Sequence, residues 1–497
     1  MVYNFNLGIG WASSGVEYAQ AYRAKVLREI GKEAKFIFTD MFPRDNIQHM
    51  AENIGFLDKE VIWLYVFFTD CRTSPVTYTL KQLEKTFASQ KFTATKEGTT
   101  MKYTFPGANI YYVAYLANND AKENRVHRVE MVSNGCLIRK DYYTYCRIYS
   151  EYYAPLDNKA HLYQRRFFNE DGTVAYEEIT DNDKVMYQFP NRLICSKEEL
   201  VGYLVSCLNL TPRDVVLIDR TTGIGQAIMQ NAGQAQIGIV IHADHFSEGS
   251  TDEEHILWNN YYEYAFSQHK HISFYITSTD TQNHLLKQQF EKYAKISPEI
   301  ITIPVGSIDK AKHPRKPRKK HSLITASRLA DEKHVDWLIE AFAKAREQVP
   351  DISLDIYGKG GEEAKLKKLI EEKKCSSCIR LCGQQNLDEI YQGYEAYLSG
   401  STSEGFGLTL MEAVGSGLPI IGFDVRYGNQ NFIDDGKNGY LIAVHGKMER
   451  QERIERLAEC IVRLFTEADL QAFHTHSYKI AQRYLTEEVK QKWNKLL

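Results

Sequence analysis

The chain has 497 residues, of which 43% are hydrophobic and 25% are charged, and its formal net charge is −3. This length and composition are typical of a globular protein with more than one domain and sizeable cores. The near-neutral charge gives no nucleic-acid-binding signature for the whole chain, and no apolar run approaches the roughly 20 residues of a membrane span.

Nine cysteines, an odd number without the spacing of a secreted scaffold, favour a reducing cytoplasm. The first residues lack a basic stretch followed by an apolar one, so we expect no secretory signal. Cys375, Cys378 and Cys382 lie close together in the sequence, but no fourth ligand with suitable spacing is obvious. We therefore expect incidental thiols there instead of a zinc site.

The chain begins with a strand, a helix and a second strand. Residues 2–7 form an apolar, strand-like run, and residues 16–30 have helical spacing with Gly31 placed to cap the helix. Residues 36–39 are a second short apolar run. This order is how a parallel, doubly wound sheet begins.

From roughly residue 61 to residue 190 the pattern predicts antiparallel β structure. Thirteen of the 32 tyrosines fall between residues 101 and 200, and tyrosine favours strands. Ser133-Asn134-Gly135 and Glu170-Asp171-Gly172 predict hairpin turns. The simplest interpretation is a β-meander inserted into a Rossmann-type domain. Its aromatic density indicates either a binding surface for a partner or acceptor, or a self-contained sheet with a tyrosine-rich core face.

The alternation of strands and helices then returns, with strands predicted at residues 215–219, 237–242 and 273–278. Residues 310–320 carry two prolines and a dense run of charge, which is typical of a solvated interdomain hinge. The alternative is a basic contact with an anionic membrane surface or a partner. A second series follows, with strands predicted at residues 323–326, 354–357, 379–381, 397–401 and 419–423, helices including residues 335–346, and a final amphipathic stretch at residues 485–497.

The predicted architecture is α/β, with two Rossmann-like domains facing each other and an antiparallel β-meander inserted in the N-terminal one. The predicted boundaries are 1–60 with 200–305 for the first domain, 61–199 for the insertion, 306–480 for the second domain, and 481–497 for a helix returning toward the first. Ligands of such sheets bind at the carboxyl ends of the strands, so we expect the active site in the cleft between the two domains.

The most informative motif runs from Ser403 to Glu412, where a strand ends and a glycine-rich turn opens a helix. Backbone N–H groups at that helix start can hold anionic or polar ligand groups. Glu404 lies in the turn and Glu412 lies about two helical turns further on. Two carboxylates there can accept hydrogen bonds from several sugar hydroxyls; the alternative is an N-terminal helix charge and a surface glutamate.

Two cations follow the first strand of the second domain. Arg328 lies at the strand end, and Lys333 is expected at the start of the next helix, so both can face the cleft. Fixed cations there would stabilise a nucleotide diphosphate leaving group as its negative charge develops. The alternative is a solvated basic pair.

Weaker signals lie at other strand ends. Tyr357 and Gly358, and the segment Cys382-Gly383-Gln384-Gln385, could approach a nucleotide, although turn chemistry explains each of them equally well. In the first domain, residues 8–17 place small residues and a helix start suited to a phosphate oxygen. His242 closes an apolar strand and could hydrogen-bond a sugar hydroxyl or simply be satisfied locally. Asp244 and His245 are second choices.

The pair Asp181 and Asp183 could hold a metal-bound diphosphate, but it lies in a predicted turn of the insertion. We interpret it as a plain turn. We therefore expect no catalytic metal and no cofactor.

These motifs resemble those of a known family. Glu404 and Glu412 match the E-x7-E motif of retaining GT-B glycosyltransferases, and Arg328 and Lys333 match that family's diphosphate pair. Residues 303–306 and 436–441 resemble the family's I-P-x-G and late G-x-N-G-x-L segments. The chain start, the tyrosine-rich insertion and the sequence IVIHADHFS resemble the GtfA-type catalytic subunits that O-GlcNAcylate serine-rich-repeat adhesins of the accessory Sec system.

The resemblance implies UDP-N-acetylglucosamine as donor, Ser/Thr of the adhesin precursor as acceptor, and a homologous GtfB-type partner subunit. It also implies action in the cytoplasm, at the inner face of the cell membrane, before export. It assigns His242, Arg328, Lys333 and Glu404 as catalytic. The implied donor-binding residues are Gly15, Val16, Glu17, Tyr18, Ala19, His242, Arg328, Lys333, Tyr357, Gly358, Gly383, Gln384, Gln385, Glu404, Gly405, Phe406, Gly407, Leu408 and Glu412.

The motif also predicts retention of configuration, with front-face departure of the nucleotide, since no residue stands out as a glycosyl nucleophile. Three alternatives stay open on the sequence alone. They are a wall teichoic acid α-glucosyltransferase using UDP-glucose, a non-catalytic glycopeptide-binding partner with this fold, and an epimerase with this fold.

Overall fold

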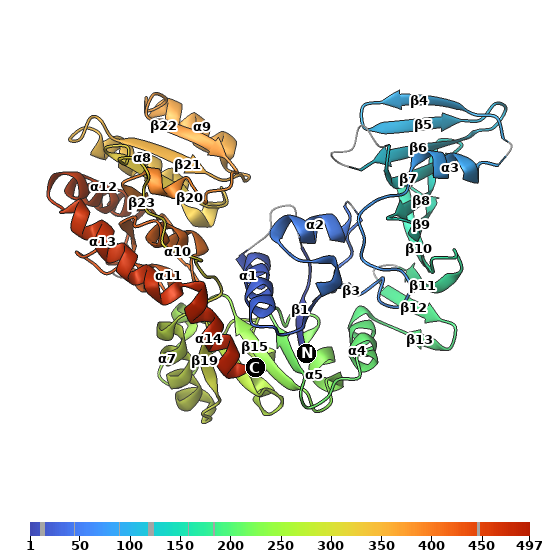
Figure 1. Cartoon of the computed structure of the whole chain (residues 1–497), viewed down its shortest axis with the longest axis horizontal. Helices are drawn as coiled ribbons and strands as arrows, with labels where there is room; N and C mark the ends of the chain where they lie inside the picture. The colour runs from blue at the N-terminus through green and yellow to red at the C-terminus, as the bar shows by residue number, and fades with distance from the viewer. Residues whose placement is uncertain are drawn as a thin grey trace. The chain divides into compact units, whose positions relative to one another are not determined.

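The computed structural model describes residues 1–9, 15–43, 45–88, 90–117, 124–157, 159–181, 184–444 and 448–497. Within these ranges the chain forms two compact units (Figure 1). The first unit comprises Met1–Lys25, Lys32–Gly238 and Tyr264–Ile272, and the second comprises Val26–Gly31, Ile239–Glu263 and Ser273–Leu497. Among the described residues, no helix has the length and apolar character needed to cross a bilayer.

The first unit contains the α/β structure that the beginning of the sequence predicts. Its elements are β1 (Val2–Asn6), α1 (Gly15–Glu29), β2 (Ala34–Phe38), α2 (Ile47–Ile54), β3 (Val61–Trp63), α4 (Lys197–Cys207), β14 (Val215–Ile218) and α5 (Gly225–Asn231). β14, β1, β2 and β3 pair in parallel in that order. Gly31 has a φ of 69°, which confirms its predicted place just beyond the end of α1.

These strands belong to a seven-stranded sheet with the order β19-β18-β15-β14-β1-β2-β3. The boundary between the units runs through α1, β15 (Gln236–Ile241) and α6 (Glu263–Ser267). The prediction of antiparallel structure from residue 61 is wrong at its beginning. Val61–Trp63 is a strand of the parallel sheet, paired with β2, because its short apolar run is buried there. A three-residue apolar run has no periodicity that could reveal its direction.

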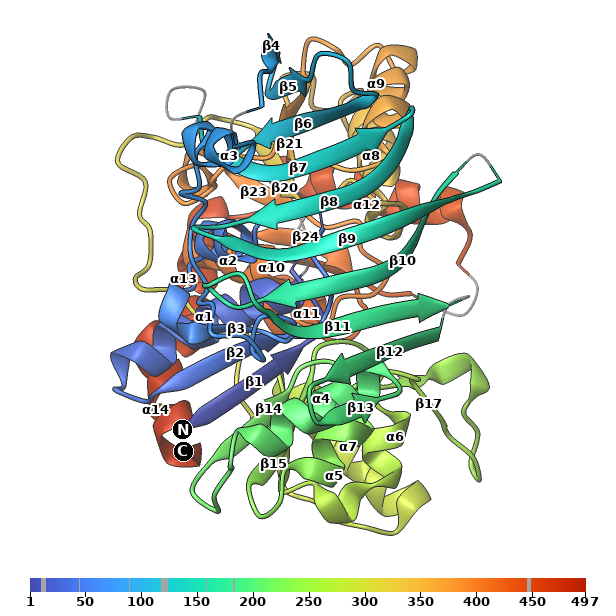
Figure 2. The same cartoon turned by 90° about the vertical axis from the view of Figure 1, so that its right-hand side faces the viewer.

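The insertion is a ten-stranded antiparallel meander in which each strand pairs with its sequence neighbour (Figure 2). Its strands are β4 (Thr93–Glu97), β5 (Thr100–Thr104), β6 (Ile110–Leu116), β7 (Val126–Ser133), β8 (Cys136–Tyr143), β9 (Arg147–Leu156), β10 (Lys159–Phe168), β11 (Val174–Asp181), β12 (Lys184–Phe189) and β13 (Arg192–Ile194). Both predicted hairpin turns are confirmed, because Gly135 and Gly172 lie between paired strands with φ of 78° and 84°.

Each face of this sheet carries a different core. Helix α3 (Leu80–Thr86) and Phe87 pack with Tyr103 and Val129 on one face. Successive side chains of a strand alternate in direction, so the residue pairing of β7 with β8 puts the row that contains Tyr142 on the opposite face. That row stacks across strands and is almost fully buried: Tyr142, Tyr149, Phe167 and Tyr176. The tyrosine-rich row is therefore a core face of the insertion.

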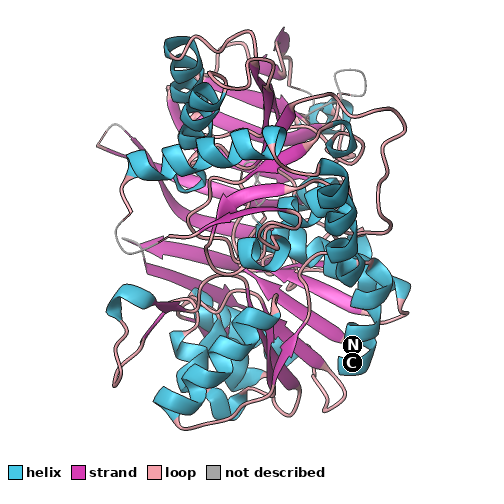
Figure 3. Ribbon diagram, turned by 90° about the vertical axis from the view of Figure 1, so that its left-hand side faces the viewer, coloured by secondary structure: helices cyan, strands magenta, loops and turns pink. Residues whose placement is uncertain are grey.

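The second unit contains a six-stranded sheet of parallel pairs in the order β22-β21-β20-β23-β24-β25. Figure 3 shows helices alongside its strands. The elements of this unit are β16 (Phe246–Ser247), β17 (Leu257–Trp258), β18 (Phe274–Thr277), α7 (Asp280–Gln289), β19 (Ile300–Thr302), β20 (Ser322–Ala326), α8 (Val335–Ala345), β21 (Ser353–Tyr357), α9 (Glu363–Glu372), β22 (Ile379–Gly383), β23 (Ala396–Leu398), α10 (Leu408–Gly415), β24 (Ile420–Phe423), α11 (Gly428–Phe432), β25 (Gly439–Ile442), α12 (Arg450–Thr466), α13 (Leu470–Ala481) and α14 (Thr486–Leu496). Every strand of the predicted second series is confirmed, and β25 is an additional strand that we did not predict.

Residues 310–320 contain no helix or strand, as predicted, but the segment is not solvated throughout. The Arg318 guanidinium donates hydrogen bonds to the carbonyl oxygens of Gln392, Tyr394 and Ser416, at 3.0, 2.7 and 2.8 Å. Lys312 is paired with Asp388 at 2.8 Å. Arg318 therefore anchors this segment to the second unit, a role that its position in a run of cations conceals.

Candidate functional site

The strongest motifs gather at one edge of the second unit's sheet. Arg328 follows β20, Gly358 follows β21, Gly383 ends β22, and Glu404 comes shortly after β23. These strands are parallel neighbours, so their carboxyl ends share one edge of the sheet. The sequence prediction that these motifs follow strand ends is thereby confirmed.

At this edge Lys333 and Glu404 form an ion pair. Their Nζ and Oε2 atoms are 2.7 Å apart, and each side chain is only 20% exposed. The Lys333 ammonium also lies 3.4 Å from the Ser401 hydroxyl oxygen. The structure thus holds a cation and a carboxylate from segments 71 residues apart at hydrogen-bonding distance. Such fixed charges can interact with developing charge without reorganising first.

Two details of the cationic motif differ from the prediction. Lys333 ends a short 3-10 turn, Asp331–Lys333, and α8 begins only at Val335, so Lys333 is not part of that helix. Arg328 lies at the predicted strand end, but its side chain is 56% exposed and its ion pair is with Glu332 at 3.0 Å. The structure therefore pairs Lys333 with Glu404 of the glycine-rich turn and pairs Arg328 with a neighbour on its own loop.

The glycine-rich turn is built by close backbone packing. Gly407 has a φ of 86° and caps α10, which begins at Leu408. A Cβ placed on Gly405 would lie 2.2 Å from the carbonyl oxygen of His242. Only glycine fits at that point, because the opposing atom belongs to a backbone. The turn that carries Glu404 is therefore packed directly against the residue that follows β15.

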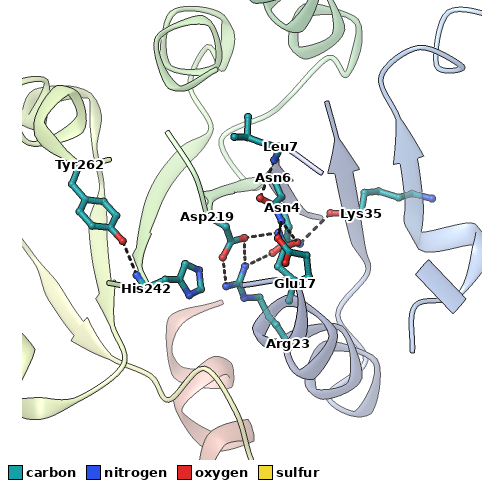
Figure 4. Close-up of polar contacts among 10 residues, drawn as sticks. Asn4, Asn6, Leu7, Glu17, Arg23, Lys35, Asp219, His242 and Tyr262 are labelled. Atoms are coloured by element: carbon teal, nitrogen blue, oxygen red, sulfur yellow. Dashed lines mark hydrogen bonds and ion pairs between the residues drawn. The ribbon is translucent and has the colours of Figure 1, made fainter. Parts of the chain in front are cut away.

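His242 is held at that strand end through its backbone. The His242 N–H donates a hydrogen bond to the Tyr262 hydroxyl at 3.0 Å (Figure 4). The Ala243 N–H donates to the same hydroxyl, also at 3.0 Å. The prediction placed His242 at the end of a strand, and the structure confirms this and adds its contact with the Gly405 turn.

The remaining predicted donor residues of the second unit have their own partners. The Tyr391 hydroxyl donates a hydrogen bond to Glu412 at 3.1 Å, and the Tyr357 and Tyr394 hydroxyls are 3.0 Å apart. A Cβ on Gly358 would lie 1.8 Å from the carbonyl oxygen of Ser327, so this glycine permits a close approach of two strand ends. Gln384 and Gln385 are exposed beside them, at the end of β22.

The predicted donor residues of the first unit begin α1. Glu17 is buried, and its carboxylate accepts a hydrogen bond from the Asn6 amide at 3.2 Å. Its side chain therefore faces a buried network, while Gly15 and Tyr18 are exposed. Residues 10–14 of the predicted phosphate loop lie outside the described residues, as do Asn182 and Asp183 of the predicted acidic turn.

That network is a further feature of the first unit (Figure 4). Arg23 and Asp219 form two hydrogen bonds, at 2.7 and 2.9 Å, and their side chains are 3% and 0% exposed. The Gln20 amide donates to the same carboxylate at 2.7 Å, and Arg23 also donates to the Asn4 side chain at 2.9 Å. The network thereby fixes α1 against β1 and β14. We did not predict it, because its members are scattered along 215 residues without a shared motif.

Neither the described cysteines nor the acidic residues cluster as metal ligands: within the described ranges, no group of three or more His, Cys, Asp or Glu side chains could hold an ion. The prediction that no metal takes part stays a prediction.

Two α/β units, a cation–carboxylate pair at the strand ends and a glycine-rich helix start beside it define a GT-B glycosyltransferase. Residues 93–191 match the family profile described as the GtfA extended beta-sheet domain, and residues 307–461 match glycosyl transferases group 1.

Full-length relatives narrow the class. The GtfA subunit of the UDP-N-acetylglucosamine–peptide N-acetylglucosaminyltransferase of Streptococcus gordonii is 53% identical, over 100% of this chain and 98% of its own length. The chain also resembles the pneumococcal O-GlcNAc transferase GtfA, whose crystal structure in complex with UDP and GlcNAc is known. The two sequences are 48% identical and the structures match with a TM-score of 0.95, over 100% of this chain and 98% of that one. A crystal structure of a GtfA/B complex is 52% identical, with a TM-score of 0.93 and the same coverage. The chain therefore belongs to the family of GtfA subunits of this peptide transferase.

Proposed function

We propose that this protein is the catalytic subunit of a complex that transfers N-acetylglucosamine from UDP-N-acetylglucosamine to Ser and Thr hydroxyls of a serine-rich-repeat adhesin precursor. Membership in the GtfA-subunit family supports this activity over a teichoic acid acceptor and over a non-catalytic role. The observation that carries the proposal is the Lys333–Glu404 pair, 2.7 Å apart at the carboxyl edge of the second unit's sheet.

In this proposal the segment Glu404–Leu408 binds the sugar hydroxyls, and Glu412 binds the ribose. The backbone around Gly358 and the segment Gly383–Gln385 approach the nucleotide. Lys333, together with Arg328 once it leaves Glu332, binds the diphosphate. The beginning of α1, Gly15–Ala19, contacts UDP through backbone groups, because the Glu17 side chain is buried and already bonded to Asn6.

The reaction breaks the bond between the anomeric carbon and the diphosphate oxygen and forms a bond from the same face to the acceptor hydroxyl oxygen. The acceptor proton passes to the departing β-phosphate oxygen, so the configuration is retained. Lys333 stabilises the charge that develops on the diphosphate, and His242 orients a sugar hydroxyl. The residues named here contribute charge and positioning instead of a covalent nucleophile.

The complex is completed by a homologous, non-catalytic GtfB-type subunit, for which the crystal structure of a GtfA/B complex at 52% identity is the support. We further propose that the enzyme acts in the cytoplasm without a metal ion. Exposed cations among residues 310–320, such as Lys316 and Lys320, are suited to contact anionic lipid at the inner face of the membrane. Transfer should accordingly be unaffected by EDTA.

The test is mass spectrometry of a Ser/Thr-rich peptide after incubation with UDP-N-acetylglucosamine, the GtfB-type subunit and each variant. Glu404→Gln and Lys333→Ala should each lower the transfer rate about 100-fold. Glu455→Gln, which disrupts the exposed Lys344–Glu455 pair in the same unit, is the matched control and should transfer normally. Full transfer by Glu404→Ala would contradict the proposed site, and a β-linked product by NMR would contradict retention.

A further inference from the structure

The segment bonded to the Glu404 turn belongs to a cluster of polar side chains, buried except for Asp244, that the proposed reaction does not use. The Tyr427 hydroxyl is 2.7 Å from Asp244 Oδ1 and 3.1 Å from His245 Nδ1. The other ring nitrogen of His245 is 2.6 Å from the Gln289 side-chain oxygen. Tyr427 and His245 are both 0% exposed, and their rings are stacked with an interplanar angle of 13°.

The protons of this cluster can be assigned from its chemistry. The Gln289 oxygen can only accept, so His245 Nε2 must donate the proton. Burial lowers the pKa of His245 to about 4, which leaves the ring neutral and Nδ1 without a proton at pH 7. The single Tyr427 proton then faces two acceptors, and the charged carboxylate of Asp244 is the nearer one. The Asp244 carboxylate also forms an ion pair with Arg426 at 3.5 Å, and Arg426 lies 3.3 Å from Glu248.

Tyr427 is also bonded to the Glu404 turn through its backbone. The N–H groups of Tyr427 and Gly428 donate to the Glu404 carbonyl oxygen at 2.6 and 2.7 Å. The Glu404 N–H donates in turn to the Arg426 carbonyl oxygen at 3.1 Å. Tyr427 therefore bonds to the backbone of the proposed sugar-binding turn through its N–H group. Through its hydroxyl it bonds to Asp244, two residues beyond His242.

We propose that Tyr427, oriented by Asp244 and His245, is a positioning residue that fixes the Glu404 turn relative to His242. A phenylalanine would fill the same volume without burying a hydroxyl, so packing alone does not account for this cluster. The hydroxyl bond to Asp244 and the close contact of Gly405 with the His242 carbonyl are two separate links between these segments. The proposal rests on the proposed function, because it assumes that Glu404 and His242 both act on the donor sugar.

The test is the steady-state kinetics of Tyr427→Phe in the complex with the partner subunit. The variant keeps the ring and loses only the hydroxyl, so kcat should fall at least tenfold while KM for UDP-N-acetylglucosamine stays within twofold. Tyr478→Phe is the matched control, since it removes a hydroxyl bonded to the carbonyl oxygens of Lys312 and Ser416 in the same unit, and it should leave kcat unchanged.

Variants of the acceptor group separate positioning from simple structural support. Asp244→Asn keeps an oxygen that accepts the hydroxyl bond and should retain kcat within threefold, whereas Asp244→Ala should match Tyr427→Phe. The double variant Tyr427→Phe with Asp244→Ala should be no slower than Asp244→Ala alone, because that substitution has already removed the hydroxyl–carboxylate bond. Multiplicative losses in the double variant would overturn the proposal.

Two further outcomes would also overturn it. One is a kcat for Tyr427→Phe within twofold of the unsubstituted protein, and the other is a lower rate explained entirely by a smaller folded fraction. Glu404→Ala is assayed alongside to separate two failures. An inactive Glu404→Ala with a normal Tyr427→Phe would refute only the positioning role, whereas an active Glu404→Ala would refute the proposed site and the positioning role with it.

Discussion

Replacing Gly405 with alanine changes the proposed site without removing any functional group. The new Cβ would lie 2.2 Å from the His242 carbonyl oxygen, whereas ordinary contacts begin at about 3.4 Å. The turn must therefore move by about 1 Å, because the opposing oxygen is a backbone atom of the residue that directly follows a buried strand and has no rotamer through which to yield. The movement would carry Glu404 with it.

A displacement of that size is large for a catalytic group. Misplacing a positioned group by about 1 Å costs on the order of 100-fold in rate, or about 2.7 kcal/mol of transition-state stabilisation. We expect kcat/KM for UDP-N-acetylglucosamine to fall by about that factor in Gly405→Ala, with the fold retained. The assay is peptide glycosylation followed by mass spectrometry, with circular dichroism to verify folding.

The matched control is Gly393→Ala, because a Cβ there meets no atom within 4 Å and this glycine has no positive φ. It should transfer at the normal rate. A normal rate in Gly405→Ala would refute the reasoning, since it would mean that the close approach of Gly405 to the His242 carbonyl does not matter for transfer. A rate lost together with the folded structure would also refute it.

Three further predictions concern stability. Arg318→Ala should lower the free energy of unfolding by about 3 kcal/mol, because it leaves several carbonyl oxygens without their donor. The control is Arg315→Ala, which should change the free energy of unfolding by less than about 0.5 kcal/mol because the Arg315 side chain is 84% exposed. Arg23→Ala should cost about 3–5 kcal/mol, because it leaves the buried Asp219 carboxylate without its counter-charge. Burial, reinforced by the nearby Arg318 charge, lowers the pKa of His474 to about 4. The unfolded chain then binds this proton more tightly, so the histidine's contribution is present above pH 6.5 and is lost as the pH falls toward 4, by about 2 kcal/mol between pH 7 and pH 5.

Urea unfolding at fixed pH measures the first two effects, and urea unfolding at pH 7 and pH 5 measures the third. Equal losses in Arg318→Ala and Arg315→Ala would show that residues 310–320 are solvated throughout. Arg23→Ala with unchanged stability would contradict the role of the buried pair in the first unit. His474→Gln should reduce the pH dependence, and an identical pH dependence with and without His474 would contradict its titration in this range.

The fold was largely readable from local patterns. Apolar runs followed by glycine-rich turns predicted β20, β21, β22, β23 and β24, because a strand buried on both faces consists of consecutive apolar residues. The same reasoning missed β25, Gly439–Ile442, which begins with a glycine directly after a polar turn, and misjudged β3. The direction of a strand depends on its partner, which a short run does not specify.

The candidate site was readable only in part. The types and spacing of Arg328, Lys333, Glu404 and Glu412 pointed to sugar-nucleotide chemistry, since that chemistry needs cations and carboxylates at strand ends. The pairing of Lys333 with Glu404, and of Arg328 with Glu332, could not be read from the sequence. Several charged side chains lie at the same edge of the sheet, and the packing of the loops decides which of them form ion pairs.

By itself, the sequence determined most of the strands and helices, which loops carry charge, and which family the motifs resemble. Periodicity, glycine placement and residue type are local properties, so they can be read directly from the sequence. Only the tertiary structure decided that Tyr427 meets Asp244, 183 residues away, and that Gly405 must be glycine because of a carbonyl at the end of β15. Contacts of this kind arise when close packing brings distant backbones together, and they leave no periodic mark on the chain.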